Sequence, residues 1–231
     1  MHTISIIIPI LNEASHISKL LHYLLEHSTL KNIAEIMVVD GGSTDGSQDI
    51  VLTFSGITLL HAEKGRAKQM NLGAKQASGS ILYFLHADSL PPKNFDTYIL
   101  NEIKKGHLAG CFRMKFKSNH LWLKLAGWLT QLPFKFCRGG DQSLFITKPL
   151  FNNIGGFDET FTIYEDNDFI SKLYQLKQFV VIQKWLITSP RCYYKNGIWT
   201  LQRHYWMLHL KKYFGASPKA LNTYYRKHIA S

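Results

Sequence analysis

Three short acidic segments follow one another along this chain: residues 40–45 (DGGSTD), 86–88 (HAD) and 165–166 (ED). Asp40 and Asp88 each follow an apolar run of the strand type, at residues 37–39 and 81–85. A carboxylate at the C-terminal end of a buried parallel strand points into the crevice where open α/β sheets bind ligands. Several carboxylates at one edge can hold a nucleotide with a divalent cation and leave one as a base. The segments therefore predict chemistry on a nucleoside diphosphate sugar.

The loop at 40–45 is the candidate nucleotide contact. A carboxylate after a strand can accept hydrogen bonds from a ribose hydroxyl or a base N–H, which fits Asp40. Gly41 and Gly42 let the backbone approach a ligand closely. Asp45 has two interpretations, a second ligand contact or a cap for the next helix, and the loop alone is compatible with an ordinary strand–turn–helix.

Lys64, Gly65 and Arg66 open a predicted helix at 65–77. Helix N-termini attract anions, and cationic side chains strengthen the attraction, so this segment predicts a diphosphate site. Gln69 and Asn71 on the same helix are candidates for further polar contacts to the nucleotide. A solvated helix start is the alternative interpretation.

His86, Ala87 and Asp88 form the candidate metal segment. Mn²⁺ and Mg²⁺ favour hard oxygen ligands, usually one or two carboxylates together with substrate phosphates, so Asp88 is the predicted ligand. Alternation at the strand end aims His86 the same way as Asp88. The softer imidazole is assigned a role off the metal, either a contact with the phosphates or that of an ordinary hydrogen-bonded histidine.

Glu165 and Asp166 open another predicted helix, at 165–176. Acids at a helix start are favoured by the dipole and are commonly structural. The functional interpretation makes one of them the general base that takes a proton from an acceptor hydroxyl.

The order of elements predicts an α/β fold. Strands at 4–9, 35–40, 57–61 and 80–85 alternate with helices, the first of which has Asn12 as its candidate cap. Such alternation is typical of a mostly parallel central sheet with helices on both faces, Rossmann-like in plan. The second half is less regular, with strands expected at 110–117, 143–147 and 180–182 and helical sequence at 196–214. No linker or repeat divides the chain, so one domain over 1–231 is expected.

The net charge of +11 is unevenly placed. Residues 1–168 hold 16 Lys or Arg and 16 Asp or Glu, whereas 169–231 hold 11 Lys or Arg and no acid. An anionic partner is indicated, either a phosphorylated substrate, an acidic membrane surface or nucleic acid, with a solvated basic face as the alternative. No apolar run reaches the ~20 residues of a membrane-spanning helix, and the start lacks a charged signal region. Three widely spaced cysteines predict a reduced, cytoplasmic setting.

Together the motifs resemble those of family 2 glycosyltransferases, over nearly the whole chain. The likeness is greatest to a bacterial subgroup labelled radical-SAM/selenodomain-associated. The motifs, in order, are PxLNE (9–13), DGGSTD (40–45), GRxxQxNxG (65–73), LHAD (85–88), GGDQ (139–142), GGF (155–157) and ED (165–166).

The resemblance implies a GT-A fold and an inverting, metal-dependent transfer from a nucleotide sugar, most simply UDP-linked. It divides the chain into a nucleotide-sugar-binding half (1–90), an acceptor-binding and catalytic half (91–190) and a basic aromatic C-terminal helical segment (191–231). Asp40 then matches the contact to uracil or ribose, Asp88 the metal-binding acid and Asp166 the catalytic base beside Glu165. The expected donor contacts are Pro9, Asn12, Glu13, Asp40, Ser43, Asp45, Lys64, Gly65, Arg66, Gln69, Asn71, His86 and Ala87, and the expected acceptor contacts are Gly140, Asp141 and Gln142.

One departure from the family pattern concerns the metal. His86 stands where most members have an acid, which bears on metal identity and on strict metal dependence. The QxxRW signature of processive members is absent, so single transfers are expected, to a hydroxyl that a lipid could carry on the cytoplasmic face of a membrane.

Two other classes of function fit part of the sequence. A sugar-nucleotidyltransferase is also α/β and metal-using, but it normally has a Gly-rich loop after the first strand, where this chain has Ile10-Leu11-Asn12-Glu13. A nucleic-acid-binding module explains the basic quarter and leaves the acidic segments without a purpose, so no nucleic acid partner is expected.

Overall fold

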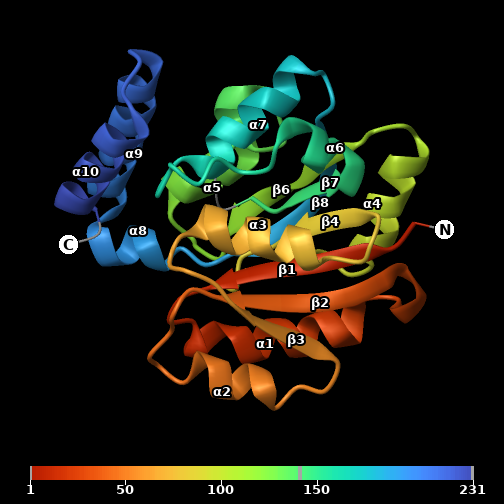
Figure 1. Cartoon of the computed structure of the whole chain (residues 1–231). Helices are drawn as coiled ribbons and strands as arrows, with labels where there is room; N and C mark the ends of the chain where they lie inside the picture. Colours follow the sequence, from red (N-terminus) through yellow and green to blue (C-terminus); the bar gives the residue numbers. More distant parts are fainter. Residues whose placement is uncertain (1, 140–141, 230–231) are drawn as a thin grey trace.

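A single sheet of eight strands forms the centre of the protein, with helices on both of its faces (Figure 1). The computed structural model describes residues 2–139 and 142–229. The strands are β1 (Ile4–Ile10), β2 (Ile33–Asp40), β3 (Ile57–His61), β4 (Ile81–Phe84), β5 (Ser89–Leu90), β6 (Ala109–Phe116), β7 (Leu144–Thr147) and β8 (Val180–Thr188). The helices are α1 (Ala14–His27), α2 (Ser47–Leu52), α3 (Arg66–Gln76), α4 (Phe95–Lys104), α5 (Leu121–Leu129), α6 (Lys148–Ile154), α7 (Glu165–Gln175), α8 (Arg191–Asn196), α9 (Ile198–Tyr213) and α10 (Pro218–His228), with short 3₁₀ turns at Leu30–Asn32 and Lys135–Cys137.

The strand order is β3-β2-β1-β4-β7-β6-β8-β5. Strands β3, β2, β1 and β4 pair in parallel, as do β6 and β8, while β7 and β5 are antiparallel to their neighbours. The prediction of an α/β fold with a mostly parallel sheet is confirmed. The antiparallel β7 lies between the two parallel groups and separates the regular first half from the second.

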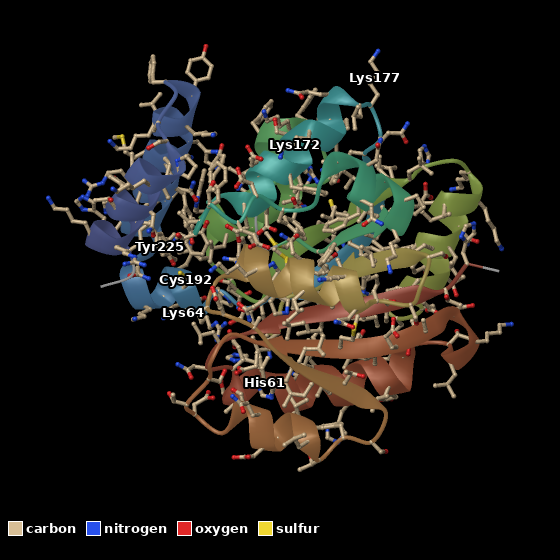
Figure 2. The ribbon with its side chains drawn as sticks, viewed as in Figure 1. His61, Lys64, Lys172, Lys177, Cys192 and Tyr225 are labelled. Atoms are coloured by element: carbon tan, nitrogen blue, oxygen red, sulfur yellow. The ribbon has the colours of Figure 1, made fainter. Side chains whose placement is uncertain are left out.

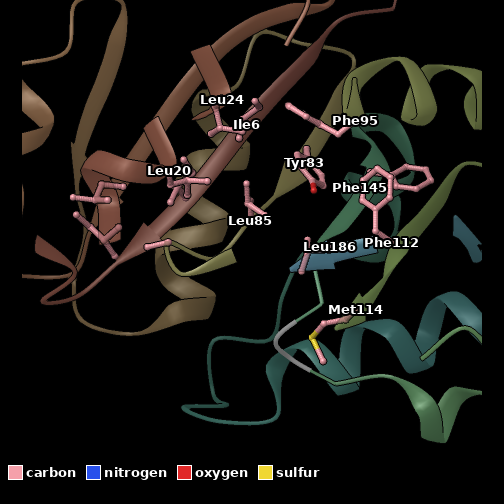
Figure 3. Close-up of a cluster of buried hydrophobic side chains, with 14 of the residues drawn as sticks. Ile6, Leu20, Leu24, Tyr83, Leu85, Phe95, Phe112, Met114, Phe145 and Leu186 are labelled. Atoms are coloured by element: carbon pink, nitrogen blue, oxygen red, sulfur yellow. The ribbon is translucent and has the colours of Figure 1, made fainter. Parts of the chain in front are cut away.

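Two buried layers hold the helices against the sheet. Because side chains alternate along a strand, Ile4, Ile6 and Ile8 of β1 pack with α1, α2 and α4, whereas Ile7 faces α3, α6 and α7. Figure 3 shows the first layer where Tyr83 and Phe95 stack with ring centroids 5.4 Å apart. This double covering explains why the strands of the first half are apolar on both faces.

Sheet register brings the functional loops to one edge. Ile10 at the end of β1 lies opposite Asp40 at the end of β2, and Phe84 at the end of β4 lies opposite Ile7. The segments after β1, β2 and β4 therefore leave the sheet side by side, as the sequence predicts for carboxyl ends of parallel strands.

The structure corrects several local predictions. Asn12 does not cap α1: the residue before that helix is Glu13, and Asn12 has a positive φ of 57°. The N-cap residue of α2 is Gly46, in a left-handed conformation, and Asp45, one residue earlier, accepts the N–H of Ser47 at the start of that helix. Strand β8 is longer than expected and runs to Thr188, because it continues alongside β6.

The C-terminal segment is more divided than expected. The helix predicted at 196–214 corresponds to α9, whereas α8, α10 and the short β5 were not predicted. Helices α9 and α10 stand together at one side of the molecule (Figure 1). Leu201 and Leu208 of α9 are buried, so part of this helix packs on the rest of the protein.

Candidate active site

The loops after β1 and β2 form one hydrogen-bonded unit. The backbone N–H of Asn12 donates to Ser43 Oγ at 2.9 Å, and Asn12 Oδ1 accepts from the backbone N–H of Thr44 at 2.9 Å. The next N–H, that of Glu13, donates to Ser47 Oγ at 2.9 Å. Hydrogen bonds between loops fix both backbones, so the PxLNE and DGGSTD motifs act together as one rigid wall of the site.

Asp45 completes this unit. Its Oδ2 accepts from the backbone N–H of Ala14 at 2.9 Å, and its Oδ1 accepts from the backbone N–H of Ser47 at 3.1 Å. Hydrogen bonds from Ser47 and then Ala14 lower the pKa of Asp45. Of the two roles predicted for Asp45, this structure therefore shows the structural one, in which the carboxylate accepts backbone N–H groups at the starts of α1 and α2.

Asp40 is the centre of its own loop. Its carboxylate is 1% exposed and accepts hydrogen bonds from the N–H of Gly42 at 2.9 Å, the N–H of Ser43 at 3.0 Å and Gln48 Nε2 at 2.7 Å. Burial by itself raises the pKa of Asp40, but these hydrogen bonds outweigh burial and lower it. Asp40 shapes the loop, and its contact with a nucleotide stays a prediction.

The side-chain amides of two residues that were predicted to contact the nucleotide form hydrogen bonds with backbone groups instead. Gln69 is 4% exposed, and its Nε2 donates to the carbonyls of Ile10 and Val39, each at 2.7 Å. Asn71 Nδ2 donates to the Phe157 carbonyl at 2.8 Å, and its Oδ1 accepts from the Phe157 N–H at 2.9 Å. Gln69 therefore clamps the ends of β1 and β2, and Asn71 anchors the GGF loop.

The predicted metal segment lies at the same sheet edge. His86 and Asp88 are partly exposed and Ala87 is 5% exposed, in a segment that turns after the end of β4, and a common direction of His86 and Asp88 stays a prediction. Asp88 Oδ2 lies 3.2 Å from Nε of Arg191, a residue of α8 that the sequence did not single out. Among the residues that the structure describes, no three His, Cys, Asp or Glu side chains gather closely enough to hold a metal ion. Asp88 alone fits a cation that takes its other ligands from substrate phosphates.

Arg66 joins the two halves of the site. From the first position of α3, its Nε lies 3.0 Å from Glu165 Oε1 and its Nη1 lies 3.3 Å from Asp166 Oδ2. The guanidinium was predicted to bind the diphosphate; in this structure it holds both acids at the start of α7. Asp166 is the more accessible of the two acids, with 14% of its side chain exposed against 2% for Glu165. Tyr164, just before them, has a positive φ of 80°, a strained conformation for a tyrosine.

The remaining predicted residues lie around this centre. Lys64 is exposed before α3, and Figure 2 draws it on the same side of the view as Cys192 of α8. Gly65 is the residue before α3, with φ of 146°, and Pro9 lies in β1 opposite Val39. Their donor contacts stay predictions.

The predicted acceptor loop is only partly described. Gly140 and Asp141 lie outside the described residues. Gln142 is 4% exposed, and its Nε2 donates a hydrogen bond to the Phe112 carbonyl at 3.4 Å. Gln142 therefore holds the loop against β6, and an acceptor contact stays a prediction.

A cavity of about 380 Å³ opens beside the two acids. Arg66, Glu165 and Asp166 form part of its wall. The rest is largely apolar and comes from β6, α5, α8 and α9, including Met114, Phe116, Trp122, Leu129, Tyr193, Tyr205, Trp206 and Leu208. His209 Nδ1 of α9 lies 2.9 Å from the hydroxyl of Tyr164, so the far wall is tied to the residue that precedes the acids. We call this space the apolar cavity; the sequence predicts helical structure at 196–214 but not that a cavity lies beside it.

The matching family model is that of glycosyl transferase family 2, over residues 5–164. This match spans more than half of the chain, so the protein belongs to glycosyl transferase family 2. It ends just before Glu165, so it covers the donor-side loops and not the acidic pair. The finer subgroup suggested by the motifs stays a prediction.

Curated relatives share the same class. The chain is 25% identical over 227 residues to the probable glycosyltransferase YdaM of Bacillus subtilis, covering 88% of this chain and 54% of that protein. It is 37% identical over 94 residues to glycosyltransferase AglE of Haloferax volcanii, covering 38% of this chain and 31% of that one. A Methanococcus voltae protein named as a dolichyl N-acetyl-α-D-glucosaminyl phosphate glucuronosyltransferase is 28% identical over 191 residues, 74% of this chain and 59% of that one. The chain thus spans between about a third and three fifths of these relatives' lengths.

Solved structures share the fold. The mannosyltransferase PcManGT of Pyrobaculum calidifontis, in complex with GDP-Man and Mn²⁺, superposes with a TM-score of 0.69 at 20% identity, over 97% of this chain and 69% of that one. TarS of S. aureus, residues 1–349 in complex with UDP, superposes with a TM-score of 0.65 at 22% identity, over 84% of this chain and 62% of that one. The predicted GT-A fold is confirmed. In the part of the chain that the structure describes, none of the helices combines the length and apolar character needed to cross a membrane.

Proposed function

We propose that this protein transfers a sugar from a nucleoside diphosphate sugar to an acceptor hydroxyl, with inversion at the anomeric carbon. The observation that carries the proposal is the Glu165–Asp166 pair, held by Arg66 in the wall of the apolar cavity. Arg66 begins the helix that follows β3, so the acids lie next to the sheet edge where donor loops 10–14 and 41–47 meet. Sugar transfer requires a base next to the acceptor hydroxyl and a nucleotide site on the opposite side of the sugar. This arrangement would provide both.

Asp166 is the proposed base, because it is the more exposed acid. As the acceptor oxygen forms its bond to the anomeric carbon, Asp166 takes the hydroxyl proton and the bond from that carbon to the diphosphate oxygen breaks. Attack opposite the leaving group inverts the carbon. Glu165 is nearly buried and shares Arg66, so its proposed role is to fix the guanidinium that orients Asp166.

A divalent cation would be held by Asp88 together with the donor phosphates. Bound there, Mn²⁺ or Mg²⁺ supplies charge stabilisation to the leaving diphosphate. The neighbours that bind GDP-Man with Mn²⁺, or UDP, support a nucleotide sugar and a cation in general. A UDP-linked donor is the form we propose to test first, with Lys64 exposed at the start of α3 as a further diphosphate contact.

The acceptor is proposed to carry an apolar group, and a lipid-linked acceptor satisfies this best. Aromatic and aliphatic side chains make more than half of the cavity wall, and Arg66, Glu165 and Asp166 stand together in it. Burying apolar surface there contributes roughly 25 cal/mol per Å². The name of the Methanococcus voltae relative, which includes a dolichyl phosphate-linked sugar, supports this class of acceptor.

The basic C-terminal segment is proposed to dock on an anionic membrane surface on the cytoplasmic side. On α9, Trp199, Trp206 and Tyr213 are 58%, 52% and 84% exposed. Lys211 and Lys212 precede Tyr213 in the chain and are partly exposed, with their Nζ atoms over the rings of Tyr224 and Phe161. Aromatic rings settle at the headgroup level, and basic side chains reach outward from it. This placement would bring a lipid acceptor to the apolar cavity.

The experiment is to incubate the protein with a panel of UDP- and GDP-linked sugars and Mn²⁺. Release of nucleoside diphosphate from one donor, through slow hydrolysis, is expected even without the acceptor. Release of the free sugar as its β-anomer from an α-linked donor, followed by NMR before mutarotation, would support inversion. Absence of hydrolysis with every donor, or release with retained configuration, would contradict the proposal.

A further inference from the structure

Arg191, the first residue of α8, bridges two acids from different loops of the donor side. Its Nη1 donates to Glu13 Oε2 at 2.8 Å, and its Nη2 donates to Glu13 Oε1. Its Nε lies 3.2 Å from Asp88 Oδ2. One guanidinium thus pairs both oxygens of the acid after β1 and one oxygen of the predicted metal ligand after β4.

This arrangement places a permanent positive charge where a cation is expected. The side chains of Glu13 and Asp88 are only 14% and 17% exposed, so their charges are poorly screened by water. Burial lowers the pKa of Arg191, but the hydrogen bonds with Glu13 and the charge of Asp88 raise it overall. Without Arg191, two half-buried carboxylates would share the site with no guanidinium to compensate them.

Helix α8 does not depend on Arg191 for its position. Tyr193 is 7% exposed and packs edge-on against Phe116, with ring centroids 5.3 Å apart. The N–H of Ser189, just before α8, donates to the Asp88 carbonyl at 3.2 Å.

The Arg191 side chain itself stays 43% exposed. A guanidinium has five N–H donors. Two of them donate to Glu13 here, Nε forms the ion pair with Asp88, and Nη1 also lies 3.3 Å from His16 Nδ1. The exposed side of Arg191 can therefore meet a ligand.

We propose that Arg191 is a donor-site residue that exchanges partners: it neutralises Asp88 in the donor-free protein and turns to the diphosphate when a cation and a nucleotide bind together. The inference rests on the proposed donor site at Asp88. A divalent cation arriving alone must displace the guanidinium from Asp88, which opposes its binding. A cation arriving with a diphosphate brings two phosphate groups to which Arg191 can pair bidentately. Cation and nucleotide therefore bind with positive coupling.

Titration calorimetry of the full chain tests this with MnCl₂ alone, and with UDP and GDP in the presence of Mn²⁺. For Arg191→Gln we expect Mn²⁺ alone to bind about 5-fold or more tighter than in the wild type, and the nucleoside diphosphate to bind about 10-fold weaker, within the usual range of coupling between sites. Arg191→Lys keeps one charge without the fork and should restore part of the nucleotide affinity. Arg226→Gln, which removes an exposed arginine of α10, should leave both affinities unchanged.

The outcomes separate this inference from the proposed function. If the wild type binds neither nucleotide with Mn²⁺, the proposed donor site fails, whereas the Mn²⁺ titration still decides whether Arg191 opposes a cation at Asp88. If Arg191→Gln binds Mn²⁺ alone no better than the wild type, Arg191 is not a competing counter-ion and the inference is overturned. Circular dichroism checks the fold of each variant, and if Arg191→Gln unfolds, Arg191→Met, which also removes the charge, takes its place in the same Mn²⁺ comparison.

Discussion

Arg66 and Asp166 are 100 residues apart in sequence, and Nη1 of the arginine lies 3.3 Å from Oδ2 of the aspartate. Arg66 also pairs with Glu165, so one guanidinium fixes both acids at the start of α7. This contact joins the helix after β3, on the donor side, to the helix that carries the proposed base. The site therefore depends on an ion pair between two halves that sequence motifs describe separately.

We expect Arg66→Gln to lower kcat by about 10²-fold, because misplacing a catalytic group by an ångström costs this much. The KM for the donor should change less, since the guanidinium holds the acids rather than the diphosphate in this structure. Steady-state kinetics of donor hydrolysis checks both constants. Lys75→Gln, at the exposed end of the same helix, serves as the matched control. A variant with raised donor KM and unchanged kcat would return Arg66 to the diphosphate role.

Asp88→Ala should weaken Mn²⁺-dependent binding of UDP far more than His86→Ala does. A carboxylate is a hard anionic ligand for these cations, whereas imidazole is softer. Calorimetric titration with UDP, with and without Mn²⁺, measures the difference. Equal losses in the two variants would make His86 a metal ligand and would reverse our ranking.

Asp40→Asn should destabilise the protein at neutral pH by about 1–3 kcal/mol, since an amide cannot accept all the hydrogen bonds that the buried carboxylate receives. The folded-state pKa of Asp40 lies below the ordinary aspartate value of 3.8, so the ionised form is favoured in the native protein. This contribution to stability is present above pH 3.8 and is lost as the pH falls through the lowered folded-state pKa.

Urea unfolding at several pH values checks this prediction. The gap in unfolding free energy between the wild type and Asp40→Asn should close at acidic pH, if the proteins remain folded there. Asp49→Asn, at an exposed position of α2, should show no such gap. A gap that is constant with pH would mean that the charge of Asp40 is not what stabilises the loop.

Vesicle flotation checks the proposed membrane docking. The protein should float with anionic vesicles at low salt and not with neutral ones, because each Lys or Arg near an anionic leaflet contributes about 1 kcal/mol. Replacing Lys211 and Lys212 of α9 by glutamine should reduce flotation. The same change at Lys31 and Lys93, exposed in the first half, should not. Equal flotation with both lipids would leave the basic segment as a solvated face.

The sequence predicts the sheet well because its strands carry strong local signals. The runs rich in β-branched residues that form β1 and β2 end at Ile10 and Asp40. Strands β3 and β4 likewise lie where apolar runs indicate strands. Lys172 pairs with Asp168 at 3.1 Å, in line with the interpretation that Asp168 points away from the site.

The contacts between loops could not be predicted in this way. Glu13 and Arg191 are 178 residues apart, and no local pattern relates them. Gln69 and Asn71 are a second case. The sequence does not tell whether an amide near a ligand-binding motif contacts a nucleotide or a backbone carbonyl. The apolar cavity is a third case, since its wall combines residues of α3, β6, α5, α7, α8 and α9, which are far apart in the sequence.

The most direct test of our account is donor hydrolysis by Asp166→Asn, measured beside Asp168→Asn. Asparagine nearly preserves shape and removes the base, for which a rate loss of roughly 10²–10⁴-fold is typical. We predict this loss for Asp166→Asn with the binding of nucleoside diphosphate retained, and a rate close to that of the wild type for Asp168→Asn. A rate near that of the wild type in Asp166→Asn would contradict the account and would move the role of base to Glu165 or Asp141.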